Sequence, residues 1–129
     1  MCMVEAADGG YWARSREAKP KARKAHRCNE CGRDIQPGEQ YRYFAGIHTE
    51  NGSMVHKCCS HCEVASKWLL EQCNGYIYSA VAADIAEHIN EVEDGYSLAR
   101  LWVGMKRKWK RFDGEGLMGL PRMPRVDNW

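Results

Sequence analysis

The sequence predicts a small α+β domain in which a β-hairpin is followed by three helices around a cluster of cysteines. Two CxxC pairs carry most of this prediction. Cys28 and Cys31 precede a run rich in Tyr, Phe and Ile, whereas Cys59 and Cys62 open a segment with helical spacing. Apolar side chains then recur every three or four residues over 79–112, which is typical of amphipathic helices.

Four cysteines in two CxxC pairs have the spacing of a structural zinc site, because four thiolates can close a tetrahedral shell around Zn²⁺. Gly32 follows the first pair, and a residue free to adopt positive φ lets the loop fold back with its amides toward the sulfurs. The second pair stands at a predicted helix N-terminus, whose dipole favours thiolates. We therefore expect one structural Zn²⁺ bound by Cys28, Cys31, Cys59 and Cys62.

Three neighbouring side chains offer alternative ligands for this site. Cys58 could replace Cys59, although a CxxC pair fits the first helical turn better than the CxxxC spacing that Cys58 would give. His56 and His61 could each replace one cysteine.

The hairpin is expected to consist of strands over residues 40–47 and 53–57, joined by a turn at 49–52 whose Asn-Gly pair supplies positive φ. A helix over 59–73 should end at an Asn-Gly pair suited to a left-handed cap. Two C-terminal helices are expected, one from an N-cap at Ser79 to about residue 95 and one from Ser97 to Phe112.

Positive charge is concentrated in two segments of a chain whose net charge is only +2. The segments cover residues 14–27 and 100–111, and acidic residues predominate between them. Such segregation indicates an anionic partner more strongly than the net charge does. The candidate contact residues are Arg14, Arg16, Lys19, Lys21, Arg23, Lys24, Arg27, Lys106, Arg107, Lys110 and Arg111.

These patterns predict four segments. Residues 1–25 hold few aliphatic side chains and form a basic, flexible N-terminal arm; residues 26–75 form the zinc-binding module. Residues 76–112 form the two-helix extension. Residues 113–129 form a tail rich in Gly, Pro and Met whose apolar side chains could lie in a groove.

The cysteine content and the lack of targeting signals indicate a reducing compartment. Seven cysteines with CxxC pairs are typical of a metal binder rather than a disulfide scaffold, so we interpret Cys2 as an incidental thiol and Cys73 as a core residue. No apolar run approaches about 18 residues, and no signal-peptide pattern opens the chain. We predict a cytoplasmic protein without a membrane partner.

The stretch CNECGRDIQPGEQYRYFAG followed by VHKCCSHC resembles the treble-clef zinc modules, of which LIM-type domains are one branch. The resemblance implies a zinc knuckle, a hairpin and a helix, with the four cysteines as ligands. The whole chain, including CEVASKWLLEQCNGYIY and LARLWVGMKRKWKRFDG, resembles small uncharacterised proteins encoded by phages and prophages, which implies the cytoplasm of a bacterial host but no particular activity.

These features favour a non-enzymatic, zinc-stabilised protein that binds nucleic acid or a nucleoprotein complex, since cations lie among aromatic residues such as Trp109. One alternative is a phage-type adaptor or inhibitor that binds a host protein through Tyr41, Tyr43 or the tail. A second is a degenerate HNH-like nuclease with His48 as base. Against it, no Asp precedes His48, and no second, catalytic metal site is evident.

Overall fold

The computed structural model describes residues 2–3 and 10–125, and it consists of a three-stranded sheet covered by helices. The antiparallel sheet has the order β1 (Trp12–Ala18), β4 (Tyr41–His48) and β5 (Gly52–Cys59). A second pair of short strands, β2 (His26–Arg27) and β3 (Asp34–Ile35), flanks the first cysteine pair. The class α+β is confirmed.

The predicted hairpin is present, as β4 and β5. Its register pairs His48 with Gly52 at the turn and Tyr41 with Cys59 at the far end. Gly52 has φ +76°, a left-handed conformation that glycine adopts without steric cost, as expected for an Asn-Gly turn. The hairpin therefore delivers the second cysteine pair to the end of the sheet where helix α1 begins.

The prediction of a flexible arm over residues 1–25 is wrong for the part that forms β1. This strand pairs with β4 along the outer edge of the sheet, and the ring of Trp12 packs edge-on against Phe44 at 4.7 Å. Five of its seven residues are exposed, so no hydrophobic alternation marked it as a strand. Residues 4–9 of the predicted arm lie outside the described part of the chain.

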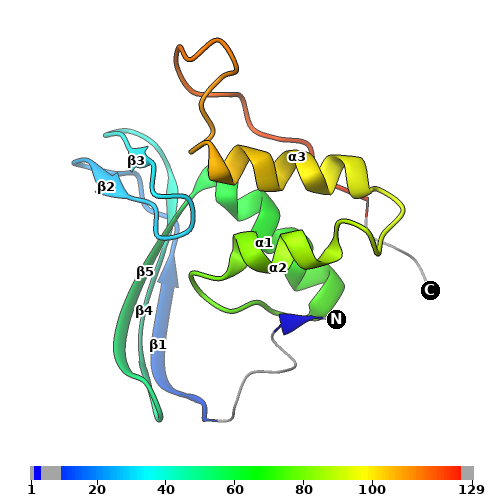
Figure 1. Cartoon of the computed structure of the whole chain (residues 1–129). Helices are drawn as coiled ribbons and strands as arrows, with labels where there is room; N and C mark the ends of the chain where they lie inside the picture. Colours follow the sequence, from blue (N-terminus) through cyan, green and yellow to red (C-terminus); the bar gives the residue numbers. More distant parts are fainter. Residues whose placement is uncertain (1, 4–9, 126–129) are drawn as a thin grey trace.

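All three described helices lie on one side of the sheet: α1 (Ser60–Cys73), α2 (Val81–His88) and α3 (Gly95–Lys106) (Figure 1). Helix α1 ends at Asn74 in the left-handed conformation, as predicted. None of these helices combines the length and hydropathy that crossing a bilayer needs. The core between them is formed by fully buried apolar side chains, among which the largest are Trp68, Trp109, Leu69, Ile85, Leu98 and Leu101.

Helix α3 ends six residues before the predicted terminus at Phe112. Lys108 and Trp109 both have positive φ, and the Trp109 amide donates to the Gly104 carbonyl at 2.7 Å, so the chain turns back on itself. Gly104 makes room for the indole, because a Cβ there would lie 2.2 Å from the ring. Trp109 is thus buried, whereas Phe112, predicted to lie on the same apolar stripe, is 77% exposed.

The tail packs against the helices as far as Arg125. The Met118 amide donates to the Trp109 carbonyl at 2.8 Å, and the indole of Trp68 donates to the Arg125 carbonyl at 3.3 Å. Asp94 accepts the Arg125 amide at 3.0 Å, and this hydrogen bond lowers the pKa of its carboxyl. Met118 and Met123 thus pack against the core, whereas Leu120 is 65% exposed. Residues 126–129 are outside the described part.

Candidate metal centre

The four cysteines of the two CxxC pairs meet where the short β2–β3 pair, the end of β5 and the start of α1 converge. Their sulfur atoms all lie within 4.8 Å of one another, and those of Cys31 and Cys59 are 3.9 Å apart. Sulfurs bound to one tetrahedral Zn²⁺ at about 2.3 Å are separated by roughly 3.8 Å. The cluster can therefore hold a metal ion, and a set of four thiolates suits Zn²⁺.

The first pair lies in a tight loop closed by β2 and β3. The Cys28 amide donates to the Arg33 carbonyl, and the Gly32 amide donates to the Cys28 carbonyl. Gly32 has φ +83°, as its position after the cysteines led us to expect. The amides of Glu30 and Arg33 consequently point at the sulfurs of Cys28 and Cys31, each at 3.4 Å, which stabilises thiolates.

The second pair lies at the N-terminus of α1, where Cys59 is the N-cap. Its sulfur accepts the Cys62 amide at 3.4 Å, and its own amide donates to the sulfur of Cys28 at 3.3 Å. Helix-terminal amides favour a thiolate at this position. The sulfur of Cys62 accepts a further hydrogen bond, at 3.2 Å, from the indole of Trp109.

Protonation of the four thiols is linked through their hydrogen bonds. The hydrogen bond from Cys31 lowers the pKa of Cys28, whereas the hydrogen bond from Cys28 raises the pKa of Cys62. In the absence of a metal ion, the thiols whose pKa is raised, such as Cys62, therefore keep their protons. A divalent ion can displace those protons, so metal binding should weaken in acid.

The alternative ligands lie close by but make other contacts. Cys58 is buried, yet the four-sulfur group contains Cys59 instead. The His61 ring accepts at Nδ1 from Arg33 and donates from Nε2 to the Met118 carbonyl at 2.6 Å; burial lowers its pKa, which favours this neutral form. His56 contacts Glu30 at 2.6 Å.

Glu30, within the first CxxC loop, caps the second helix, a role that the sequence did not suggest. Its buried carboxylate accepts the amides of Ser79 at 2.7 Å and Val81 at 3.2 Å and contacts Nε2 of His56. The predicted N-cap at Ser79 is therefore wrong: Ser79 has φ +68°, and no side chain of its own segment caps α2. The loop over residues 28–33, which we call the metal loop, thus holds the two-helix extension in place.

Replacing Glu30 with Gln should lower the free energy of unfolding by about 1.5–3 kcal/mol, because hydrogen bonds to a charged group are lost from a buried site. The matched control is Glu87→Gln, a substitution at an exposed position of α2. Urea unfolding followed by circular dichroism measures both variants. Equal midpoints for the two would contradict the capping role of Glu30.

Every candidate cation of the two basic segments is exposed. Lys19 pairs with Glu63 at 2.5 Å, and the guanidinium of Arg107 lies over the ring of Phe112 at 4.9 Å. Arg27 of the first segment and Lys110 of the second line the same open pocket. The exposed residues are Arg14, Arg16, Lys19, Lys21, Arg23, Lys24, Arg27, Lys106, Arg107, Lys110 and Arg111.

Two other residues are sequence-based candidates for functional roles: His48 as a catalytic base and Tyr41 as a contact for a protein partner. His48 lies at the turn end of the hairpin, whereas Cys59 lies at its other end. Nδ1 of His48 accepts hydrogen bonds from the amides of Glu50 and Asn51. Tyr41, a candidate partner contact, is only 7% exposed.

Of the two cysteines outside the cluster discussed above, Cys73 is buried in the core, as predicted, whereas the prediction for Cys2 is wrong. Cys2 and Cys73 form a disulfide, with Cα atoms 5.7 Å apart, so Cys2 is not an incidental thiol. Their separation of 71 residues explains why no local spacing revealed the pair.

The comparisons with known proteins add no relative. No protein-family model, curated protein or solved structure matches this chain. The resemblances to treble-clef modules and to phage-encoded proteins therefore stay predictions.

Proposed function

We propose that this protein is a non-enzymatic, zinc-stabilised binding protein that contacts nucleic acid, or a nucleoprotein complex, through basic segments 14–27 and 100–111. One observation carries the proposal. Arg27 is distant in sequence from Lys108 and Lys110, yet the three line one open pocket of about 380 Å³ beside Gly32 of the metal loop. Cations gathered in this way can neutralise neighbouring phosphates of a nucleic-acid backbone.

The ion in this proposal is structural Zn²⁺. Four cysteines complete a tetrahedral shell, so no coordination position is open for a substrate or a water nucleophile. The loop of Cys28 and Cys31, the β4–β5 hairpin and α1 then constitute a treble clef, and the metal fixes the surface on which Arg27 and Lys110 meet.

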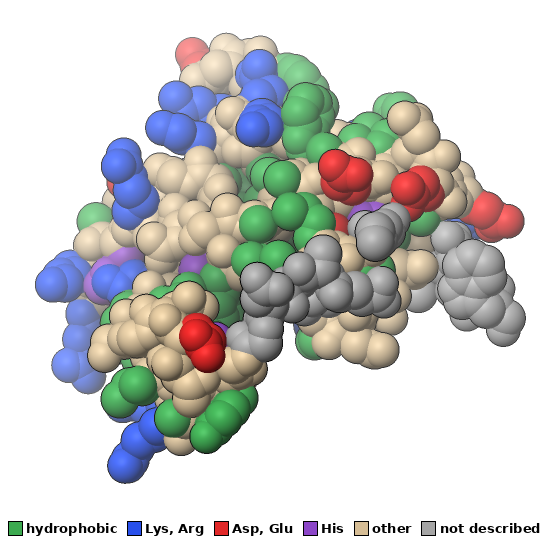
Figure 2. Space-filling model, turned by 60° about the horizontal axis from the view of Figure 1, so that its bottom comes forward, with side chains coloured by type: hydrophobic (Ala, Val, Ile, Leu, Met, Phe, Trp, Pro, Cys, Tyr) green, Lys and Arg blue, Asp and Glu red, His purple; other side chains and the backbone are tan. Residues whose placement is uncertain are grey.

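The cationic surface extends from the metal loop toward the edge of the sheet. Arg14 and Arg16 on β1 are two residues apart and therefore project from the same face of the strand, beside an open groove of about 540 Å³. Figure 2 shows Lys and Arg side chains along one edge of the molecule, while most of the visible Asp and Glu side chains lie toward the opposite side. An elongated polyanion fits such an edge.

The mode of contact in this proposal is with the backbone rather than with bases. Trp109 is fully buried, so its indole is not free to stack on a base. Phosphate contacts give affinity and position but carry no sequence information. We therefore expect similar affinities for unrelated sequences of equal length.

The test is fluorescence anisotropy with unrelated duplex oligonucleotides over a range of salt concentrations. The logarithm of the association constant should fall with the logarithm of salt, with a slope of about −0.9 for each phosphate neutralised. Lys110→Glu should weaken binding to all sequences and make the slope shallower by about 1.

The matched control is Lys67→Glu, which makes the same charge change at an exposed position of α1 outside both basic segments. It should leave the slope unchanged. A flat salt dependence of the unmodified chain, or equal losses for the two variants, would contradict the proposal.

A protein partner is the second candidate, favoured by one exposed aromatic side chain in α3 and one in the segment after it. Tyr96 and Phe112 are 76% and 77% exposed, and with Val103 and Met118 they line a pocket of about 420 Å³. Aromatic side chains of this kind are enriched at interface hot spots. An adaptor or inhibitor that used this pocket would lose its partner on Phe112→Ala and retain it on Lys110→Glu.

A further inference from the structure

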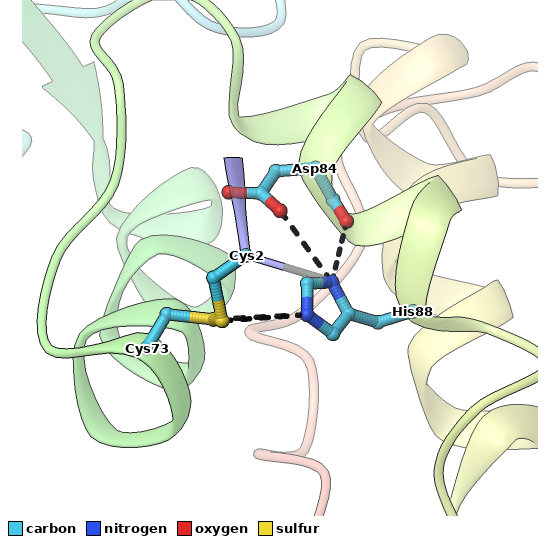
Figure 3. Close-up of a disulfide and its surroundings, with 4 residues drawn as sticks. All are labelled: Cys2, Cys73, Asp84 and His88. Atoms are coloured by element: carbon cyan, nitrogen blue, oxygen red, sulfur yellow. Dashed lines mark hydrogen bonds and ion pairs between the residues drawn. A yellow bond between two sulfur atoms is a disulfide. The ribbon is translucent and has the colours of Figure 1, made fainter. Parts of the chain in front are cut away.

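A second group of metal-ligating side chains lies at the C-terminal end of α1, opposite the end that carries the four-cysteine centre. Cys73 is the last residue of α1 and His88 the last residue of α2, and both are buried; Cys2 reaches them from the N-terminal segment. Figure 3 shows the three side chains converging, with the His88 ring directed at the sulfurs. Three segments of the chain thus bring two sulfurs and one imidazole to a single point.

The two distances from His88 to the sulfurs match those of a metal site, although the sulfurs themselves are joined in a disulfide. Nε2 of His88 lies 3.6 Å from the sulfur of Cys73 and 3.8 Å from that of Cys2. Zn–S bonds of about 2.3 Å and a Zn–N bond of about 2.0–2.1 Å, at a tetrahedral angle, give an N···S separation of roughly 3.6 Å. His88 therefore already stands where a ligand of a shared ion would stand.

The hydrogen bonding of His88 leaves the correct nitrogen free for a metal. Nδ1 lies 2.8 Å from the backbone carbonyl of Asp84 and donates its proton to that oxygen. Nε2 then carries the lone pair, and it is Nε2 that faces the sulfurs. A ligating histidine held through its other nitrogen is the usual arrangement at metal centres.

Asp84 lies beside the ring nitrogen of His88 that faces away from the sulfurs (Figure 3). Its side chain is 1% exposed, and burial raises the pKa of its carboxyl. Oδ1 lies 3.4 Å from Nδ1 of His88. A carboxylate or carbonyl at the second nitrogen is what usually orients a ligating histidine.

We propose that Cys2, Cys73 and His88 form a second, redox-controlled metal site that binds a thiophilic divalent ion such as Zn²⁺ when the two thiols are reduced. The disulfide is the closed, metal-free form of this site. Three protein ligands leave one coordination position for water, and the partly exposed Cys2 provides the route by which the ion enters. Asp84 is a positioning residue that orients His88.

Reduction of the Cys2–Cys73 disulfide converts the metal-free form into the metal-binding form. A thiol reductant supplies two electrons and, with solvent, two protons; the Cys2–Cys73 bond breaks, and two thiols result while the reductant is oxidised to its disulfide. Zn²⁺ then forms two Zn–S bonds and one bond to Nε2 of His88, and the two thiol protons pass to solvent. Reducing conditions that preserve the thiols of the four-cysteine centre also favour this form.

The test is the zinc content of the full-length chain by native mass spectrometry, after equilibration with Zn²⁺ and with either dithiothreitol or oxidised glutathione. The reduced chain should hold one ion more than the oxidised chain, whose mass without metal should be lower by two hydrogens. Cys2→Ser should hold no additional ion under either condition. This substitution is at a partly exposed position near the terminus, so the four-cysteine centre should keep its own ion.

Two further variants separate ligand loss from damage to the fold. His88→Gln should lose the additional ion, whereas His48→Gln, at the hairpin turn, should retain it. An equal zinc content of the reduced and oxidised chains would overturn the proposal. So would retention of the additional ion by reduced Cys2→Ser.

Discussion

Replacing Cys62 with serine is expected to abolish the cooperative thermal unfolding of this protein. Binding of a structural Zn²⁺ contributes about 10–16 kcal/mol at neutral pH, as much as the whole stability of a small domain. Cys62 is fully buried and connects α1 with Trp109, so its loss affects both the metal and the core. Circular dichroism should show a loss of helix, and the zinc content should fall by one ion.

The matched control is Cys58→Ser, the same substitution at a site equally buried and four residues away. It should retain the zinc ion and unfold cooperatively. If instead Cys62→Ser kept its zinc and its unfolding transition while Cys58→Ser lost both, the ligand set would have to include Cys58.

The second large effect is expected for Trp109→Phe. The indole donates a hydrogen bond to the sulfur of Cys62 and fills the space that Gly104 leaves open. Phenylalanine keeps most of the apolar area but removes the donor, and hydrogen bonds to charged groups contribute about 1.5–3 kcal/mol. Loss of a group that supports a metal ligand typically lowers metal affinity about 10–100-fold.

Competition with a chromophoric zinc chelator measures that affinity. Trp102→Phe, at a half-buried position of α3, is the control and should leave zinc affinity unchanged. Equal zinc affinities for the two variants would contradict a role of Trp109 at the metal centre.

The parts of the fold that could be predicted from sequence are those specified by local patterns. The CxxC spacing, Gly32 and the Asn-Gly turn each fix a short stretch of backbone, and together they position the hairpin and α1. Asn74 likewise ends α1 as its preference for the left-handed conformation predicts.

The parts that could not be predicted depend on contacts between distant segments. Five of the seven residues of β1 are exposed, so the strand is defined by its pairing with β4. The capping of α2 comes from Glu30, about 50 residues earlier. The sequence has a regular apolar period through Phe112, but helix α3 ends at Lys106. The chain turns there, and the indole of Trp109 donates to the sulfur of Cys62. Hydrophobic periodicity does not contain such tertiary contacts.

The grouping of positive charges at one pocket also depends on contacts between distant segments of the chain. The β2–β3 pair and the reversal after α3 bring Arg27 and Lys110 to one pocket, although the sequence only shows that each belongs to a basic segment. The proposed binding surface is therefore a product of the metal centre and the Trp109 turn. Variants that disturb either should weaken nucleic-acid binding as well as stability.

X-ray absorption at the zinc edge of the Cys2→Ser variant is the sharpest test of the four-cysteine zinc centre, because this substitution removes a ligand of the proposed second site and leaves the four cysteines in place. We predict one zinc ion per chain with four sulfur neighbours at about 2.3 Å. A zinc-free folded chain would contradict it. A shell containing nitrogen at about 2.0–2.1 Å would also contradict it, since a histidine would then have taken the place of a cysteine.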